Sequence, residues 1–183
     1  MKRVAWISPA VDEKGILLGD NGFVNCGAQA PEKVITLKNP RPDIINFKAA
    51  FTAGEKYFKL NPKEGGIPAK GEANIQIIPE PIPQTSDIAP DLYAGTLEIQ
   101  TADGAPPLVV RLHQTARGAI ISSTLKELYD FGDVKVGTTG TIPFSLTNSG
   151  NLEVTATLNL GSQNFKIDNL DTATVKLAPA DTV

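Results

Sequence analysis

The sequence predicts an all-β protein built from two tandem antiparallel β-sandwiches. Three observations lead to this prediction: apolar and polar residues alternate in most segments, no stretch of ten or more residues has a convincing helical period, and one set of motifs occurs twice. With 183 residues, of which 41% are hydrophobic, the chain can form packed cores. Disorder throughout the chain is therefore excluded.

Each predicted strand of the first half carries apolar residues on one face. In residues 33–38, for example, Ile35 and Leu37 share a face. Residues 19–22, Gly-Asp-Asn-Gly, contain the Asn-Gly pair that is typical of a tight hairpin. The only helical candidate is the short segment 123–129. In chain order, the predicted strands are 33–38, 45–51, 73–78, 93–101 and 108–115.

Four motifs occur twice in the same order, about 110 residues apart. The matched pairs are 26–27 with 136–137, 34–40 with 143–149, 57–60 with 164–167, and 67–70 with 177–180. A period of this length is too long for a solenoid repeat and suits a sandwich domain. We therefore expect two copies of one module, in residues 1–118 and 119–183.

The second copy is shorter than the first. The first continues from Gly71 to Gly118 with three predicted strands, whereas the chain ends two residues after Asp181, which aligns with Gly71. We expect the second copy to be C-terminally incomplete, either because the chain has been cut or because another segment supplies the missing strands. Those strands would cover four positions that are expected to face inward: Phe144, Leu146, Val154 and Leu158.

The repeated motifs resemble a known family. In the second copy they are a Phe-Gly-x-Val-x-Val-Gly opening at 131–137, Leu-Thr-Asn at 146–148, Phe-Lys-Ile at 165–167 and a Leu-Ala-Pro turn at 177–179. This pattern resembles the ASH family, the immunoglobulin-like domains of hydin and other ciliary and centrosomal proteins. Similar domains occur in tandem in large bacterial surface proteins, and the wider group includes the major sperm protein and the PapD-type pilus chaperones. The resemblance implies two immunoglobulin-like domains and no catalytic residue.

Composition and charge exclude several classes of function. The formal net charge is −3 and the basic residues are dispersed, which argues against nucleic-acid binding. No apolar run approaches the roughly 18 residues of a membrane helix, so we expect no membrane insertion. A single His and a single Cys leave little material for a metal site or a general base. We therefore expect no enzyme, no cofactor and no metal.

Four polar or reactive residues have simple structural interpretations. Asn39 and Asn148 end matching strands, where asparagine forms turns because it bonds its neighbouring backbone and tolerates positive φ. His113 should point outward beside Arg111 as a solvated surface residue. Cys26 aligns with Val136 and should be a small buried hydrophobe.

A proline-rich segment, residues 79–90, is the candidate contact site. Four prolines in 12 residues fix an extended loop between two strands of the first copy. It is interpreted either as a stiff connection or as a contact loop held by a rigid frame. The possible contact residues are Pro79, Pro81, Ile82, Pro83 and Pro90.

The expected function is that of a non-catalytic structural or interaction module, part of a larger repeat-containing surface or scaffold protein. The alternative is a chaperone-like or partner-binding protein that acts by β-strand addition at an exposed sheet edge. Either way, we expect protein partners at loops or sheet edges and contacts with neighbouring repeats of the same chain. The resemblance favours a bacterial cell surface, and a cytoplasmic or ciliary scaffold is the alternative location.

Overall fold

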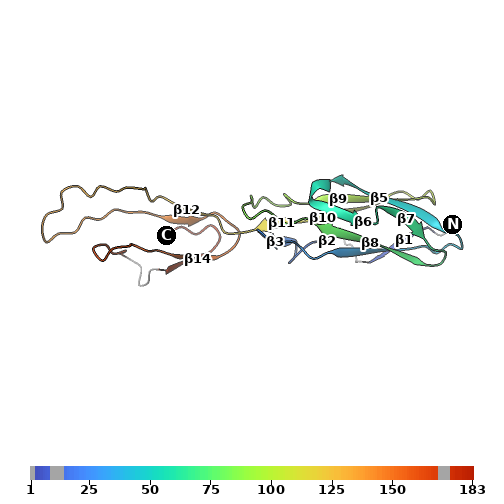
Figure 1. Cartoon of the computed structure of the whole chain (residues 1–183), viewed down its shortest axis with the longest axis horizontal. Coiled ribbons are helices and arrows are strands. Elements are labelled where there is room, and N and C mark those ends of the chain that lie inside the picture. Colours follow the sequence, from blue (N-terminus) through green and yellow to red (C-terminus); the bar gives the residue numbers. More distant parts are fainter. Residues whose placement is uncertain (1–2, 9–14, 169–173) are drawn as a thin grey trace. The chain divides into compact units, whose positions relative to one another are not determined.

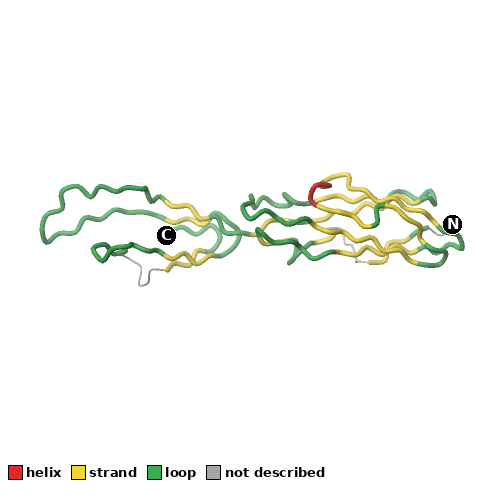
Figure 2. The backbone as a smooth tube through the Cα atoms, viewed as in Figure 1, coloured by secondary structure: helices red, strands yellow, loops and turns green. Residues whose placement is uncertain are grey.

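The computed structural model describes residues 3–8, 15–168 and 174–183, and the chain divides into two compact units, Met1–Arg117 and Gly118–Val183. Strands make up almost all of the regular structure, as Figure 2 shows, which confirms the all-β prediction. The described helical structure is one 3-10 turn, Glu55–Tyr57. The helical candidate at 123–129 is wrong, because these residues end a strand and continue without helical structure.

The first unit is a sandwich of a four-stranded and a five-stranded sheet (Figure 1). The four-stranded sheet has the order β1 (Ala5–Ser8), β4 (Lys33–Lys38), β8 (Glu72–Pro79) and β6 (Phe58–Asn61). The five-stranded sheet has the order β2 (Ile16–Leu17), β10 (Leu108–His113), β9 (Gly95–Thr101), β5 (Ile45–Ala53) and β7 (Glu64–Ile67). A short parallel pair, β3 (Phe23–Asn25) and β11 (Thr115–Arg117), completes the unit.

Alternation along the strands builds the core of the first unit. Ile35 on β4 pairs with Ile75 on β8, and both side chains are fully buried. Leu97 and Ile99 on β9 are buried in the same cluster from the opposite sheet. Each such side chain contributes about 1.5–3 kcal/mol when it is fully buried. Cys26 packs partly buried against this cluster, close to its predicted role.

The tight turn predicted at 19–22 is confirmed, but the flanking strands do not form a hairpin ladder. β2 pairs with β10 and β3 with β11, and the Asp20–Phe23 bridge alone joins the two sides of the turn among the described residues. The Asp20 amide donates to the Phe23 carbonyl at 2.9 Å, and the Phe23 amide donates back at 3.0 Å. Asn21 and Gly22 have φ values of 52° and 89°. Two successive positive φ values are what a type I′ turn requires, and Asn-Gly adopts them at low cost.

The last predicted strand of the first copy is divided in two. β10 ends at His113 and β11 begins at Thr115, because the chain changes its parallel partner from β2 to β3 at this point. Gln114 lies at the break, where its carbonyl accepts a hydrogen bond from the Tyr93 amide at 3.2 Å. Alternation in sequence does not show such a change of partner.

The second unit contains two two-stranded sheets. β12 (Ile121–Ser123) pairs with β13 (Leu146–Asn148), and β14 (Val154–Thr157) pairs with β15 (Thr174–Leu177). β13 is also hydrogen-bonded to Val183, because the Leu146 backbone N–H donates to the Val183 carbonyl at 2.8 Å. The described core is small. Leu146, Val175 and Leu177 are buried, while three of the positions predicted to face inward are only partly buried against them: Phe144, Val154 and Leu158.

Candidate functional site

Asn39 is a fully buried polar residue at the end of β4. Its Nδ2 donates to the Asp43 carbonyl at 2.7 Å, and also to the carbonyls of Ile67 and Pro68 at 3.2 and 3.1 Å. Its Oδ1 accepts from the Arg41 amide at 2.9 Å. The side chain therefore shapes its own turn, as predicted, and it also holds the turn that follows β7 nearly thirty residues later.

Asn148, at the end of β13, makes the equivalent set of bonds in the second unit. Its Nδ2 donates to the Leu152 carbonyl at 2.9 Å and to the carbonyls of Leu177 and Ala178 at 3.0 and 3.3 Å. Its Oδ1 accepts from the Gly150 amide at 3.0 Å. Asn148 too is fully buried. We call each set of bonds an asparagine clasp.

The turns that the two clasps hold also correspond. Lys70 and Ala180 occupy matching positions and have φ values of 55° and 69°. Neither Asn39 nor Asn148 is among the described residues with positive φ, so the predicted tolerance of positive φ is not what these asparagines use. Their bonds to distant carbonyls could not be found from local turn rules, because those rules consider only the neighbouring backbone.

The structure separates the five proline-loop residues into two groups. Pro79 ends β8 and is buried, and Ile82 is 1% exposed, with its amide donating to the Ala28 carbonyl at 2.9 Å. These two positions are therefore corrected from contact residues to core residues. Three residues remain exposed, and for these a contact role stays a prediction: Pro81, Pro83 and Pro90.

The prediction that His113 is a solvated surface residue is wrong. Its side chain is 19% exposed, and its Nδ1 lies 2.9 Å from the Asp91 Oδ2. Arg111 Nη2 lies 3.4 Å from the same oxygen. Alternation gives the direction of His113 on β10, but it does not show that the loop containing Asp91 packs over that face.

Asp103 connects the two sheets of the first unit. In the turn after β9, its carboxylate accepts from Thr101 Oγ1 at 2.7 Å and from the amides of Val4 and Ala105 at 3.0 and 3.1 Å. Burial acts to raise the pKa of this carboxyl, but the three hydrogen bonds outweigh burial and hold the pKa below its usual value. Because Val4 directly precedes β1, the carboxylate ties this edge strand to the opposite sheet.

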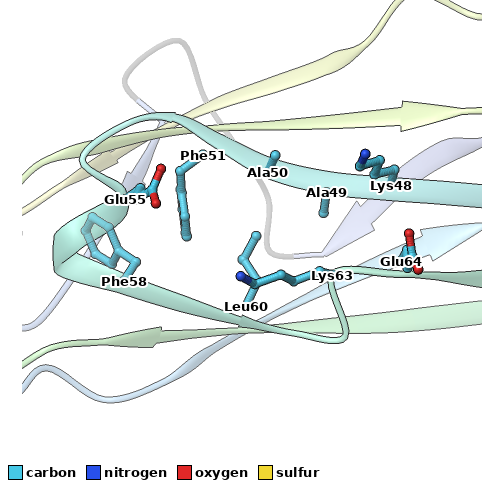
Figure 3. Close-up of a pocket in the computed structure, with 9 residues that line it drawn as sticks. All are labelled: Lys48, Ala49, Ala50, Phe51, Glu55, Phe58, Leu60, Lys63 and Glu64. Carbon is cyan, nitrogen blue, oxygen red and sulfur yellow. The ribbon is translucent and has the colours of Figure 1, made fainter.

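A cavity of about 470 Å³ lies between β5 and β6, and we call it the β5–β6 groove. Its floor is apolar and consists of Ala49, Phe51, Phe58 and Leu60. Figure 3 shows Phe51 and Phe58 close together at one end of the groove, where their ring centroids are 5.4 Å apart. Neither the alternation of β5 nor that of β6 predicted this groove, since it depends on where two sheets separate.

The rim of the β5–β6 groove carries four exposed charged residues. Glu55 lies beside the two phenylalanines, and Lys48 and Glu64 lie at the opposite end, with Lys63 between (Figure 3). None of these four side chains forms an ion pair with another described residue. The groove therefore offers apolar surface together with charges of both signs.

The second unit exposes much of its apolar surface. The ring centroids of Phe131 and Phe165 lie 5.6 Å apart, but the two side chains remain 39% and 51% exposed. Val136 is 99% exposed. The exposed large apolar side chains of this unit are Ile120, Ile121, Leu125, Leu128, Phe131, Val134, Val136, Leu152, Leu160, Phe165 and Val183.

Two other kinds of site were sought among residues 3–8, 15–168 and 174–183. No group of three or more His, Cys, Asp or Glu side chains in these segments is placed to hold a metal ion. In the same segments, no helix has the length and apolar character needed to cross a membrane. The candidate surfaces are therefore the β5–β6 groove, the exposed prolines and the open face of the second unit.

Comparison with known proteins gives structural similarities only. No protein-family model matches the chain, and no curated protein is similar to it in sequence. The periplasmic chaperone SfaE is 12% identical with a TM-score of 0.45, over 99% of this chain and 85% of the chaperone.

Two other similar structures cover less of the chain. WR4, an MSP family member of C. elegans, is 15% identical with a TM-score of 0.38, over 55% of this chain and 99% of its own. A human CEP192 domain described as ASH/PapD-like is 13% identical with a TM-score of 0.38, over 63% of this chain and 96% of its own. The similar structures thus include MSP-family, ASH/PapD-like and periplasmic-chaperone folds.

Proposed function

We propose that the chain is a non-catalytic structural or interaction module, in which two copies of one β-sandwich belong to a larger repeat-containing surface or scaffold protein. The observation that carries the proposal is the repeated asparagine clasp. Asn39 and Asn148 bond equivalent turns through the same atoms. The same hydrogen bonds at equivalent positions are expected of two copies of one module in which this asparagine stabilises the fold. A bacterial cell surface is the proposed location, with a cytoplasmic or ciliary scaffold as the alternative.

A chimera tests whether the second unit is a copy of the first. The backbone N–H of Asn39 donates a hydrogen bond to the Gly71 carbonyl at 2.9 Å, and the backbone N–H of Asn148 donates one to the Asp181 carbonyl at 3.0 Å. Residues 72–117 can therefore be joined after Asp181 in matching register. We expect the lengthened second unit to unfold cooperatively and to protect its amides from exchange. If the added residues stay unprotected, the two units are not copies of one module.

A second candidate function is β-strand addition to the second unit. In the first unit β5 pairs with β7 on one side and with β9 on the other, whereas among the described residues β14 pairs with β15 alone. The cross-strand pair Val154–Leu177 of β14 and β15 matches the pair Ile45–Ile67 of β5 and β7. The free edge of β14 therefore corresponds to the edge that β9 occupies, and a partner strand can pair there.

A peptide with the sequence of residues 93–101 tests this candidate, because those residues include β9. Added to the full chain, it should slow hydrogen exchange at the amides of β14. The matched control is the same peptide with serine at the positions of Leu97 and Ile99, the two side chains that β9 buries. Equal effects of the two peptides on β14, or no effect of either, would contradict strand addition at this edge.

A further inference from the structure

We propose that the β5–β6 groove binds an extended peptide segment of a partner protein. The segment adds to the free part of β5 and places one apolar side chain on the groove floor, between a basic and an acidic side chain. This inference deepens the proposed role as an interaction module. It concerns the first unit, so it stands apart from strand addition to the second.

The backbone of β5 supplies the first argument. β5 pairs with β7 from Ile45 to Lys48, and the Ala49 amide donates to the Lys63 carbonyl at 2.7 Å, but β5 itself continues to Ala53. In an antiparallel ladder, the N–H and C=O groups of every second residue point to the same side. The N–H and C=O of Phe51 therefore point to the side where Ala49 meets Lys63, beyond the end of β7. An extended chain can pair with these groups.

The floor supplies the second argument. Phe58 and Leu60 are only 4% and 8% exposed, while Phe51 is half-buried above them. A volume of about 470 Å³ lies within the range of about 300–1,000 Å³ that ligand sites occupy, and it has room for an aromatic or leucine side chain. A strand that pairs opposite Phe51 directs a side chain to this floor, because directly opposite residues point to the same face.

The rim charges determine the chemistry of the segment. β5 runs from Lys48 toward Glu55, so an antiparallel segment begins near Glu55 and ends near the two lysines. A basic residue two positions before the apolar one then lies toward Glu55. Because Lys63 already bonds Ala49, the segment leaves the ladder after the residue opposite Phe51, and an acidic residue two positions after the apolar one then lies toward Lys63 and Lys48. Residues two apart on a strand share a face. The preferred segment therefore reads basic-x-apolar-x-acidic.

A synthetic peptide tests the proposal on the full chain. The probe is the heptapeptide Thr-Lys-Thr-Phe-Thr-Glu-Thr with blocked ends, and binding is followed by amide NMR shifts. We expect saturable shifts at residues 49–53 and 58–60. N-methylation of the peptide phenylalanine, whose N–H faces β5, should weaken binding at least tenfold. N-methylation of the preceding threonine, whose N–H faces away, should change it less than twofold.

Charge variants complete the test. Glu55→Lys should weaken binding about fivefold, which corresponds to the loss of roughly 1 kcal/mol for an exposed ion pair. Glu32→Lys, an exposed position outside the groove lining, should leave binding unchanged. Equal binding of the two N-methylated peptides, shifts confined to other regions, or groove shifts that grow with protein concentration without peptide would overturn the proposal. The last result would mean that a second copy of the chain fills the groove.

Discussion

Gln114 is an unusual residue for the interior of a sandwich. It is fully buried at the break between β10 and β11, and neither its Oε1 nor its Nε2 has a hydrogen-bond partner among the described residues. An unsatisfied buried polar group costs about 1–3 kcal/mol. A methionine has nearly the same shape and carries no such cost.

We predict that Gln114→Met raises the free energy of unfolding by about 1 kcal/mol. Urea denaturation of the full chain measures the change for the first unit. Gln76→Met is the control, because Gln76 lies at the surface with its amide bonded to Asn61 and Glu32, and its effect should stay within about 0.5 kcal/mol. A loss of stability in Gln114→Met would show that the buried amide has an internal partner, such as a bound water.

The Asp103 carboxylate should make the first unit sensitive to acid. Its pKa is lowered in the folded state, because hydrogen bonds from Thr101, Val4 and Ala105 outweigh the effect of burial. Its contribution to stability is therefore fully present above the unfolded pKa of about 3.9, and it is lost as the pH falls through the lower folded pKa.

Removal of the Asp103 charge tests this expectation. Stability is measured by denaturation at about pH 6 and at steps down to about pH 2, because this range includes the unfolded pKa. Asp103→Asn should be less stable than the natural chain near neutral pH and should lose less stability on acidification. Parallel acid profiles for the two proteins would mean that Asp103 has the same pKa folded and unfolded.

At the scale of the strands, alternation predicted the centres better than the ends. Lys33–Lys38 forms with its expected bounds, because Ile35 and Leu37 face one core throughout its length. The strand expected from Tyr93 begins instead at Gly95. Tyr93 is held by the Gln114 carbonyl outside the ladder, a contact between distant parts of the chain. Strand ends depend on such contacts, and periodicity within one segment does not contain them.

Removal of an asparagine clasp should strongly lower the stability of the unit that contains it. Asn39→Ala removes the donor to three carbonyls and should lower the free energy of unfolding of the first unit by about 2–3 kcal/mol. Asn148→Ala should act in the same direction on the second unit. Amide hydrogen exchange distinguishes the two units within one protein.

Asn74→Ala is the control for both clasp variants. Asn74 is an exposed residue of β8 that accepts one hydrogen bond from Thr36 Oγ1 at 2.9 Å, so its replacement should change stability by less than about 1 kcal/mol. Each clasp variant should lower protection in its own unit and leave the other unchanged. Equal losses in both units after Asn148→Ala would contradict independent modules.

At the scale of the whole molecule, the repeated motifs predicted some strands and missed others. β4 overlaps the motif at 34–40 and β13 lies within its match at 143–149. Of the matched pair 57–60 and 164–167, the first contains most of β6, whereas the second forms no strand. The motifs did not reveal the β5–β6 groove or the burial of Ile82, since both depend on how sheets and loops pack in three dimensions.

The last prediction concerns the stability of the second unit. Its described core contains Leu146, Val175 and Leu177, while Phe131 and Phe165 remain exposed. If three such side chains are left half exposed, the lost burial amounts to about 2–4 kcal/mol. That loss is a large part of the roughly 5–15 kcal/mol that stabilises a typical small domain. The segment 1–118 should therefore fold alone, whereas 119–183 alone should be partly unfolded, aggregated or strand-exchanged.

Hydrogen exchange on the two separate segments and on the full chain measures this difference. In the full chain, the amides of β12 to β15 should exchange faster than those of β4, β8 and β9, because protection follows the burial of the strands. The first segment serves as the control, since its two sheets enclose a continuous core. If 119–183 alone protects its amides as well as 1–118 does, then the second unit is a complete smaller fold. Its exposed apolar side chains would then be ordinary surface residues, and no partner strand would be needed to cover them.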